Sequence, residues 1–482
     1  MQLRVKSIAA LAERILPRSR SVRHVAVLLG GTVGAQAIMV LAAPLLTRLY
    51  TPHDFGLLAT YVALLAVLSV ISGLRYELAI PLPESDEEAA ALLVLAEVVV
   101  FGMSALSLVL VVFARQPIAR ALNTPALADY LWLVPVGVLL AGTYQVFNYW
   151  SVRTKSFNTI ARTKVTQAVG ATGVQLAGYA FGPVSLLLGH VASQAAGLTS
   201  LAVAAWRNAP ALRTVTVAAM AAQAKRHRRF PLFSTWSGFM NAASAQMPAF
   251  LLAALFNPAV AGMYMLTQRV LAGPMTLVGT AIAQVFLSQA PQAHRDGTLP
   301  AVVTKIHGAL SRIISPPMAL VAVAGPHLFA VAFGAQWRTA GEFAAWLAAA
   351  TYFQFLASPL SMISATVEKQ AGGMMAVAGL LAVRLGALYA AYAMGSSSLA
   401  IIFFAIVSAL WYFLYGAWSL SIAGANALAA FRESARAAVL SLLACTPLLV
   451  TEHLLGGRWF ALSLAASVAL MAALYLHWRK SM

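Results

Sequence analysis

The stretch LLTRLYTPHDFGLL, from Leu45 to Leu58, shares its pattern with LLAALFNPAVAGMY, from Leu251 to Tyr264. In both stretches leucines precede an aromatic residue, then a proline, then a glycine, and all of these align without gaps at one constant offset. Proline and glycine are common at helix ends in general, but their fixed spacing with the aromatic residue indicates an internal duplication. We expect each copy to close one apolar helix and to open the next.

Long apolar runs surround both copies. Hydrophobic residues make up 61% of the 482-residue chain, only 10% of the residues are charged, and the mean hydropathy is +0.81. A soluble domain has about 25% charged residues, so this excess of apolar surface requires lipid as its solvent. About fourteen runs are long enough to cross a bilayer, at about 20 residues each. The sequence therefore predicts an all-α polytopic membrane protein.

The two copies of the repeat lie six predicted spans apart. Because six is even, both halves keep the same orientation, as in transporters built from parallel repeats around a central site. We predict two pseudo-symmetric six-helix lobes, with two further spans that lie outside the repeat as a peripheral addition. The predicted segments are a cytoplasmic basic amphipathic segment at 1–24, an N-lobe at 25–206, a cytoplasmic linker at 207–231, a C-lobe at 232–422, and two extra spans with a tail at 423–482.

The formal net charge is +18 and the pI is near 10.4. In a soluble protein such a balance would favour nucleic-acid binding, but here the basic residues lie in short segments between apolar runs. Most of the 32 Lys and Arg residues fall in alternate segments, which by the positive-inside rule places both termini in the cytoplasm. The single cysteine, Cys445, excludes a disulfide within the chain and a cysteine-based metal site. We expect no cofactor, no metal and no nucleic-acid partner.

Four stretches, in order along residues 25–425, carry a resemblance to a known family. They are LYTPHDFG (Leu49 to Gly56), RYELAIPLPESDEEA (Arg75 to Ala89), YQVFNYWSVRTKSFNTIARTKVTQ (Tyr144 to Gln167) and FGAQWRTAGEFAAWLA (Phe333 to Ala348). The chain resembles the O-antigen and exopolysaccharide flippases of the multidrug/oligosaccharidyl-lipid/polysaccharide exporter superfamily. The resemblance implies two six-helix lobes around a central cavity. It also implies movement of undecaprenyl-diphosphate-linked sugars between the leaflets of the bacterial inner membrane.

Charged side chains inside apolar spans indicate where the cargo binds. Each costs about 2.5–3.5 kcal/mol near the bilayer centre, so each needs a reason. A guanidinium fork matches the oxygens of a lipid-linked diphosphate, so we predict a cationic cavity that contains Arg269, with Arg48, Arg75 or Arg384. The alternatives are headgroup contact for Arg269, an interfacial position for Arg48 and a cytoplasmic anchor for Arg75.

Two carboxylates, Glu77 and Glu97, lie within predicted spans near the cytoplasmic side. Such groups carry protons or sodium ions, or form structural pairs, so both are candidates for ion coupling. Arg75 and Glu77 are two residues apart and do not share a helical face. A partner for Glu77 is therefore expected from another helix.

Three other functions compete with a flippase. A cation-coupled drug antiporter of the same superfamily would favour acidic residues in the cavity, whereas arginines dominate here. A membrane glycan polymerase or transferase would need a larger outside loop or a close acidic pair, and a non-transporting assembly scaffold would need neither. We expect a monomeric, non-enzymatic transporter that works by alternating access, with the bilayer and the lipid-linked oligosaccharide as partners. Polysaccharide polymerase and chain-length proteins are further candidate partners.

Overall fold

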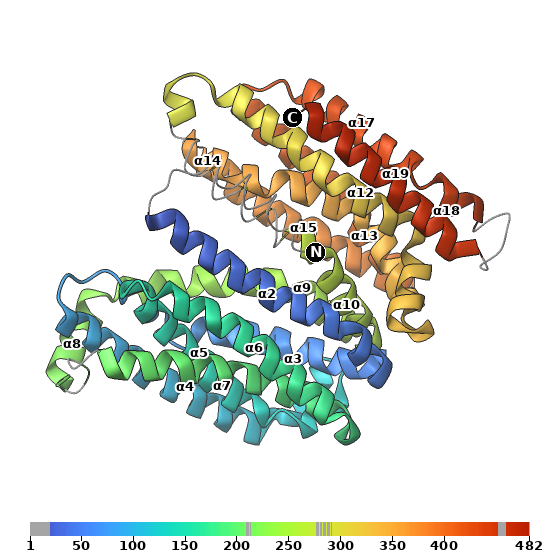
Figure 1. Cartoon of the computed structure of the whole chain (residues 1–482). Helices are drawn as coiled ribbons and strands as arrows, with labels where there is room; N and C mark the ends of the chain where they lie inside the picture. Colours follow the sequence, from blue (N-terminus) through green and yellow to red (C-terminus); the bar gives the residue numbers. More distant parts are fainter. Residues whose placement is uncertain are drawn as a thin grey trace. The chain divides into compact units, whose positions relative to one another are not determined.

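The computed structural model describes residues 20–208, 212, 214–275, 279, 282, 286, 290, 292–367, 369–451 and 459–481. These residues form helices and no β-strand, as predicted. The chain divides into two compact units, Met1–Met265 and Leu266–Met482, coloured from blue to green and from yellow to red in Figure 1. Of the predicted segment 1–24, residues 1–19 lie outside the described part. The lobe boundaries derived from the repeat remain a prediction.

Unit 1 is a bundle of long helices that run alongside one another in Figure 1. Its elements are α2 (Arg20–Leu49), α3 (Pro52–Ile71), η1 (Tyr76–Ala79), α4 (Asp86–Ala121), η2 (Pro125–Asp129), α5 (Leu133–Arg153), α6 (Phe157–Ala177), η3 (Tyr179–Phe181), α7 (Pro183–Asn208), α8 (Val217–Arg226), the π-helix η5 (Phe230–Ser234), α9 (Thr235–Leu255) and the first half of α10 (Pro258–Pro274). Predicted spans thus fold as helices, and the predicted linker 207–231 contains a helix of its own.

The turns that the repeat predicts form in both copies. Thr51 caps α3, because its side chain accepts a hydrogen bond from the amide of Asp54 while the Asp54 carboxylate accepts one from the amide of Thr51. Such a capping box, followed by a proline at the first helical position, is a strong helix start. In the second copy Asn257 Oδ1 accepts a hydrogen bond from the amide of Val260, 3.1 Å away.

The two copies also pack directly against each other within unit 1. A Cβ atom on Gly56 would lie 1.9 Å from the carbonyl oxygen of Pro258, and a Cβ atom on Gly262 would lie 2.1 Å from that of Pro52. Each glycine therefore lets the backbone of the other copy approach more closely than any side chain allows. We call this reciprocal contact the glycine–proline crossing.

Unit 2 continues from α10 with a second set of helices. These are α12 (Leu299–Phe333), η7 (Ala335–Trp337), α13 (Arg338–Ala357), η8 (Pro359–Met362), α14 (Ile363–Thr366), α15 (Gln370–Ala393), α16 (Ser397–Ile422), α17 (Ala427–Leu443), α18 (Thr446–Val450) and α19 (Phe460–Ser481). Side-chain oxygens of Ser396 and Asn426 cap α16 and α17 by accepting backbone hydrogen bonds.

A line of polar side chains joins α17 to α12 and α13. The imidazole Nδ1 of His307 lies 3.1 Å from Ser434 Oγ, and Ser311 Oγ lies 2.8 Å from Tyr352 Oη. Tyr352 Oη also donates to the backbone carbonyl of Ser434 at 3.0 Å. All four side chains are buried, so their hydrogen bonds are made to one another rather than to water, while Nε2 of His307 has no partner among the described residues.

The same line continues along α12. Ser441 Oγ donates to Ser315 Oγ at 3.0 Å, and Arg312 forms an ion pair with Glu433. We call this set of contacts between α17 and the helices α12 and α13 the polar seam. It shows that α17, which belongs to the predicted peripheral addition, is tied to the core helices of unit 2.

Ten helices within the described ranges are long and apolar enough to cross a membrane. They are Val27–Leu49, Pro52–Ile71, Asp86–Ala121, Pro183–Trp206, Phe230–Leu255, Leu299–Phe333, Ala335–Ser361, Gly372–Ala393, Ser397–Ile422 and Phe460–Trp478. The protein is therefore a multi-pass membrane protein, while the count of about fourteen spans, at about 20 residues each, remains a prediction.

Candidate functional site

Arg75 and Glu77 lie in a connection between two helices rather than inside a span. Helix α3 ends at Ile71, earlier than the predicted span end near residue 80, and the chain then turns through Leu74 and Arg75 at φ of 47° and 63°. Non-glycine residues in this left-handed region are uncommon and cost about 1–3 kcal/mol each. Two in succession form a strained turn that leads into η1.

This turn brings Arg75 and Glu77 together. Arg75 Nη1 lies 3.8 Å from Glu77 Oε1, and the Glu77 side chain is 2% exposed while that of Arg75 is 20% exposed. The expectation that Glu77 would find its partner on another helix is wrong, because the spacing rule behind it holds only for α-helical residues. Burial raises the pKa of the Glu77 carboxyl, and a backbone hydrogen bond and the Arg75 charge oppose that rise.

The guanidinium of Arg75 rests on a glycine of α9. A Cβ atom on Gly238 would lie 2.3 Å from Arg75 Nη2 and 2.7 Å from its Nε. Among the described residues, Arg75 Nε and Glu77 Oε2 are buried and have no hydrogen-bond partner. The pair is thus close but incompletely satisfied, and the absence of a side chain at Gly238 gives Arg75 its place.

Glu97, the second predicted coupling residue, lies on α4 and faces α5. Its Oε2 accepts a hydrogen bond of 2.9 Å from Thr143 Oγ1, while its buried Oε1 has no partner within the described part of the chain. The residue is half-buried. The structure therefore gives Glu97 a hydroxyl partner and, unlike Glu77, no ion pair among the residues described.

The end of unit 1 near η1 is fastened by two further arginines. Arg153, at the end of α5, donates to the carbonyl oxygens of Pro83, Glu84 and Ser85 and forms an ion pair with Asp86. These contacts hold the segment that leads into α4.

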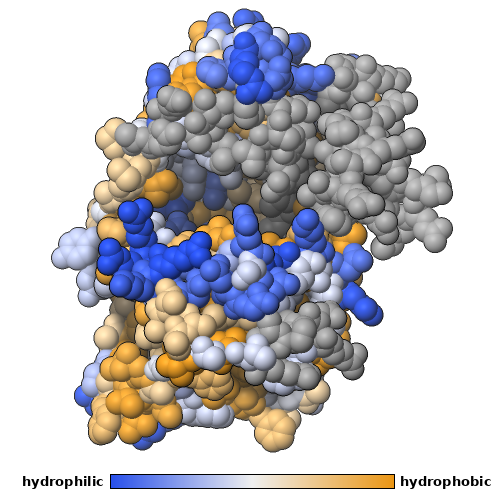
Figure 2. All heavy atoms as spheres, turned by 90° about the vertical axis from the view of Figure 1, so that its left-hand side faces the viewer, coloured by the Kyte–Doolittle hydropathy of each residue, from blue (hydrophilic) through white to orange (hydrophobic). Residues whose placement is uncertain are grey.

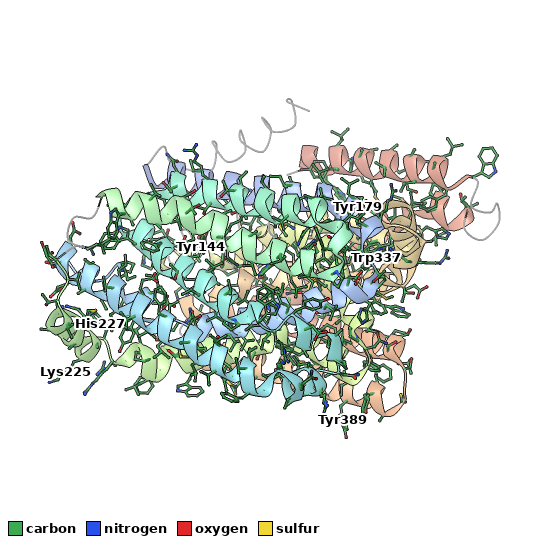
Figure 3. All side chains as sticks on the ribbon, turned by 90° about the horizontal axis from the view of Figure 1, so that it is seen from below. Tyr144, Tyr179, Lys225, His227, Trp337 and Tyr389 are labelled. Carbon is green, nitrogen blue, oxygen red and sulfur yellow. The ribbon has the colours of Figure 1, made fainter. Side chains whose placement is uncertain are left out.

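The second arginine belongs to α8. Arg226 donates to both carboxylate oxygens of Glu88 at 3.0 Å, so the predicted linker is docked on α4. Figure 2 faces the side where α8 lies in Figure 1 and shows hydrophilic side chains gathered there. Figure 3 places Lys225 and His227 at this end of unit 1 and Tyr179 at the opposite end, with Tyr144 between them. The predicted topology assigns these two ends of unit 1 to opposite sides of the membrane.

Arg384 lies near the middle of α15 and faces α16 in unit 2. Its Nε donates to Ser408 Oγ at 2.9 Å, and its guanidinium carbon lies 4.6 Å from the Phe404 ring centre and 5.6 Å from that of Tyr412. Cation–π contacts of this kind stabilise a buried cation. The α16 residues therefore explain how a charge is accommodated inside a span.

For Arg269 and Arg48 the structure gives the helix and the degree of burial. Arg269 is half-buried within α10, and Arg48 is exposed in the last turn of α2. Of the six predicted site residues, the described contacts bring together only Arg75 and Glu77. Sequence reasoning missed Gly238, Thr143 and the α16 partners of Arg384, because each lies on a helix that does not include the residue that it contacts.

Residues 45–342, more than half of the chain, match the family described as polysaccharide biosynthesis protein, while no curated protein matches. The fold resembles the lipid II flippase MurJ in an inward closed conformation, with a TM-score of 0.73, 11% identity, and coverage of 94% of this chain and 98% of that one.

Two multidrug transporter structures are similar in fold as well. An inward-facing multidrug resistance MATE family transporter of the MOP superfamily has a TM-score of 0.65 at 12% identity, covering 82% of this chain and 95% of that one. A MATE structure in complex with MaL6 has a TM-score of 0.51 at 13% identity, covering 84% and 97%. At such identities the likeness concerns the fold alone. The match over residues 45–342 decides the family, and the chain is a member of the polysaccharide biosynthesis protein family with the fold of a membrane transporter.

Proposed function

We propose that this protein moves an undecaprenyl-diphosphate-linked oligosaccharide, the repeat unit of an O-antigen or exopolysaccharide, across the bacterial inner membrane by alternating access. The observation that carries the proposal is family membership together with a fold shared over nearly the whole chain with a protein named as a lipid II flippase. In this proposal the protein acts as a monomer, both termini are cytoplasmic, and no covalent step is catalysed.

The arginines support an anionic cargo. Arg75 is half-buried, with 20% of its side chain exposed, and its contact with Glu77 is long at 3.8 Å, so we propose that its guanidinium can bind diphosphate oxygens. Nε of Arg384 donates to Ser408, and we propose that its two terminal nitrogens, which make no hydrogen bond to the described residues, bind an anion. We propose that Arg269 and Arg48 are further residues that bind the cargo. Glu77 and Glu97 are the proposed coupling residues, for protons or sodium ions.

Flipping by purified protein in proteoliposomes tests the proposal. A fluorescent undecaprenyl-diphosphate oligosaccharide would be added, and its appearance in the opposite leaflet would be followed for wild type, Arg75→Ala, Arg269→Ala and Arg384→Ala. Arg120→Ala is a matched control, because Arg120 is an exposed arginine at the end of α4. We expect wild type and the control to transport the probe, and at least one of the other three arginine variants to lose most of its transport.

Two results would count against the proposal. One is absence of flipping with several glycans despite folded protein. The other is efflux of cationic drugs against an ion gradient, which would favour the antiporter that the MATE-like fold also accommodates. Normal flipping by all three variants would retire these arginines as the cargo site while leaving the flippase intact.

A further inference from the structure

Glu77 is buried, with 2% of its side chain exposed, between residues that pack into an apolar cluster. Its element, η1, packs into a cluster to which α4 contributes Leu92 and Ala96 and α5 contributes Val146 and Trp150, with Phe230 of η5 at its edge. Moving a carboxylate into such surroundings is costly unless a cation or hydrogen bonds compensate it. The ionised form of Glu77 therefore depends on a cation or hydrogen-bond donors close to its carboxylate.

Few charged or titratable groups face Glu77. On its own segment there is Arg75, and on α5 Tyr149 lies within electrostatic reach of both. On α4 Glu97 accepts a hydrogen bond from Thr143, and Asp86 and Glu88 pair with Arg153 and Arg226. The turn before η5 carries His227, whose charged neighbours are Arg226 and Glu88. Arg75 is thus the cation that compensates Glu77 among the described residues.

Arg75 is held in a way that permits it to leave. Its ion pair with Glu77 is long, at 3.8 Å, and its side chain is 20% exposed. The left-handed turn at Leu74 and Arg75 stores strain, as is common where a structure has two arrangements. An arriving diphosphate offers several charged oxygens in the geometry that a guanidinium prefers.

We infer that Glu77 binds a proton when Arg75 leaves it for the diphosphate of the cargo, so that cargo capture and proton uptake are linked. The inference rests on the proposed function and names Arg75 as the group that exchanges partners. Without Arg75 the Glu77 carboxylate would be a buried, uncompensated charge, and such groups neutralise instead. The proton comes from water and returns to water when the cargo is released.

Cargo binding should therefore depend on pH. Burial raises the pKa of Glu77 and the Arg75 charge lowers it, so removal of Arg75 raises the pKa further. Between the paired and unpaired pKa values, binding takes up as much as one proton. Cargo affinity then rises as the pH falls, by at most about tenfold per pH unit for a single proton.

Calorimetry on the full-length protein in nanodiscs tests the linkage. The probe is a short polyprenyl-diphosphate-N-acetylglucosamine, a diphosphate diester whose own charge stays constant near neutral pH. Titration at one pH in buffers of different ionisation enthalpy gives the number of protons taken up on binding. We expect a clear fraction of a proton for wild type and none for Glu77→Gln, which should bind with little pH dependence.

Two matched controls isolate the site. Glu87→Gln removes an exposed carboxylate in the first turn of α4 and should leave proton uptake unchanged. Gly238→Ala should displace the Arg75 guanidinium and reduce proton uptake, because Glu77 is then partly protonated beforehand. Gly102→Ala, where a Cβ meets nothing within 4 Å, should behave as wild type.

The outcomes separate the two proposals. Binding of the probe by wild type without proton uptake, or with the same uptake in Glu77→Gln, overturns the linkage and leaves the flippase in place. Failure of folded wild type to bind any diphosphate diester overturns the cargo assignment and the linkage with it. The inference is supported if proton uptake is lost in Glu77→Gln and reduced in Gly238→Ala, while the controls Glu87→Gln and Gly102→Ala behave as wild type.

Discussion

Substitution of Gly56 by alanine should destabilise the protein through a clash that no side-chain rotation can relieve. The new Cβ atom would lie 1.9 Å from the carbonyl oxygen of Pro258 and 2.3 Å from its carbonyl carbon, whereas contacts under 3.0 Å essentially never occur. Because both partners are backbone atoms, α3 and α10 must move apart by about 1 Å or more.

The magnitude follows from two opposing effects. Alanine in place of glycine stabilises a helix interior by about 1 kcal/mol, whereas overpacking a tight contact costs about 1–3 kcal/mol and occasionally more. The clash is more severe than one extra methylene in an ordinary core, so we expect a net loss of about 1–2 kcal/mol or more. Gly262→Ala should behave alike, since its Cβ would lie 2.1 Å from the carbonyl oxygen of Pro52.

Unfolding of the purified protein in mixed micelles would measure these losses, with Gly102→Ala as the open-space control. Because both glycines line the glycine–proline crossing, the double variant Gly56→Ala/Gly262→Ala should lose less than the sum of the single losses. Wild-type stability in Gly56→Ala, or strict additivity in the double variant, would refute the reasoning.

Three further substitutions can be measured in the same unfolding assay. Arg153→Ala removes a cation that donates to three carbonyl oxygens and should cost about 1.5–3 kcal/mol; a smaller loss would show that water replaces it. Arg226→Ala breaks an exposed pair and should cost less than about 1 kcal/mol, so a larger loss would contradict simple docking of α8. Tyr352→Phe removes one hydroxyl from the polar seam and should cost about 0.6–1.7 kcal/mol, and a neutral result would mean that the hydroxyl is dispensable there.

Much of the fold could be predicted because lipid solvation imposes long apolar helices, and proline and glycine mark their ends. The helices on both sides of Pro52 and Pro258 follow this logic, and both turns were predicted from the repeat. The reciprocal contact between the two copies could not be predicted, since a spacing along the chain does not say which backbones meet. The docking of α8 could not be predicted, because a basic linker suits an anionic membrane surface as well as it suits Glu88 of α4.

The candidate site was predicted only as a set of residue types. A charged residue in an apolar run is visible in sequence, which is why Arg384 and Glu97 were found. Its partner on another helix, such as Ser408 or Thr143, is not visible. The apolar run predicts a helix through Arg75 and Glu77, but α3 ends at Ile71. The α-helical spacing rule, by which residues two apart do not share a face, therefore does not hold for this pair. By contrast, the polar seam had a readable signal in the four-residue spacing of His307, Ser311 and Ser315.

Through the polar seam, α17 covers buried polar groups of α12 and α13 that would otherwise lack hydrogen-bond partners. A chain cut after Ile422 would present the His307 imidazole, the Ser311 hydroxyl and the Tyr352 hydroxyl without their α17 partners. Hydrocarbon offers no replacement for those hydrogen bonds. A shortened chain that ends after Ile422 would therefore need apolar residues along that face of α12.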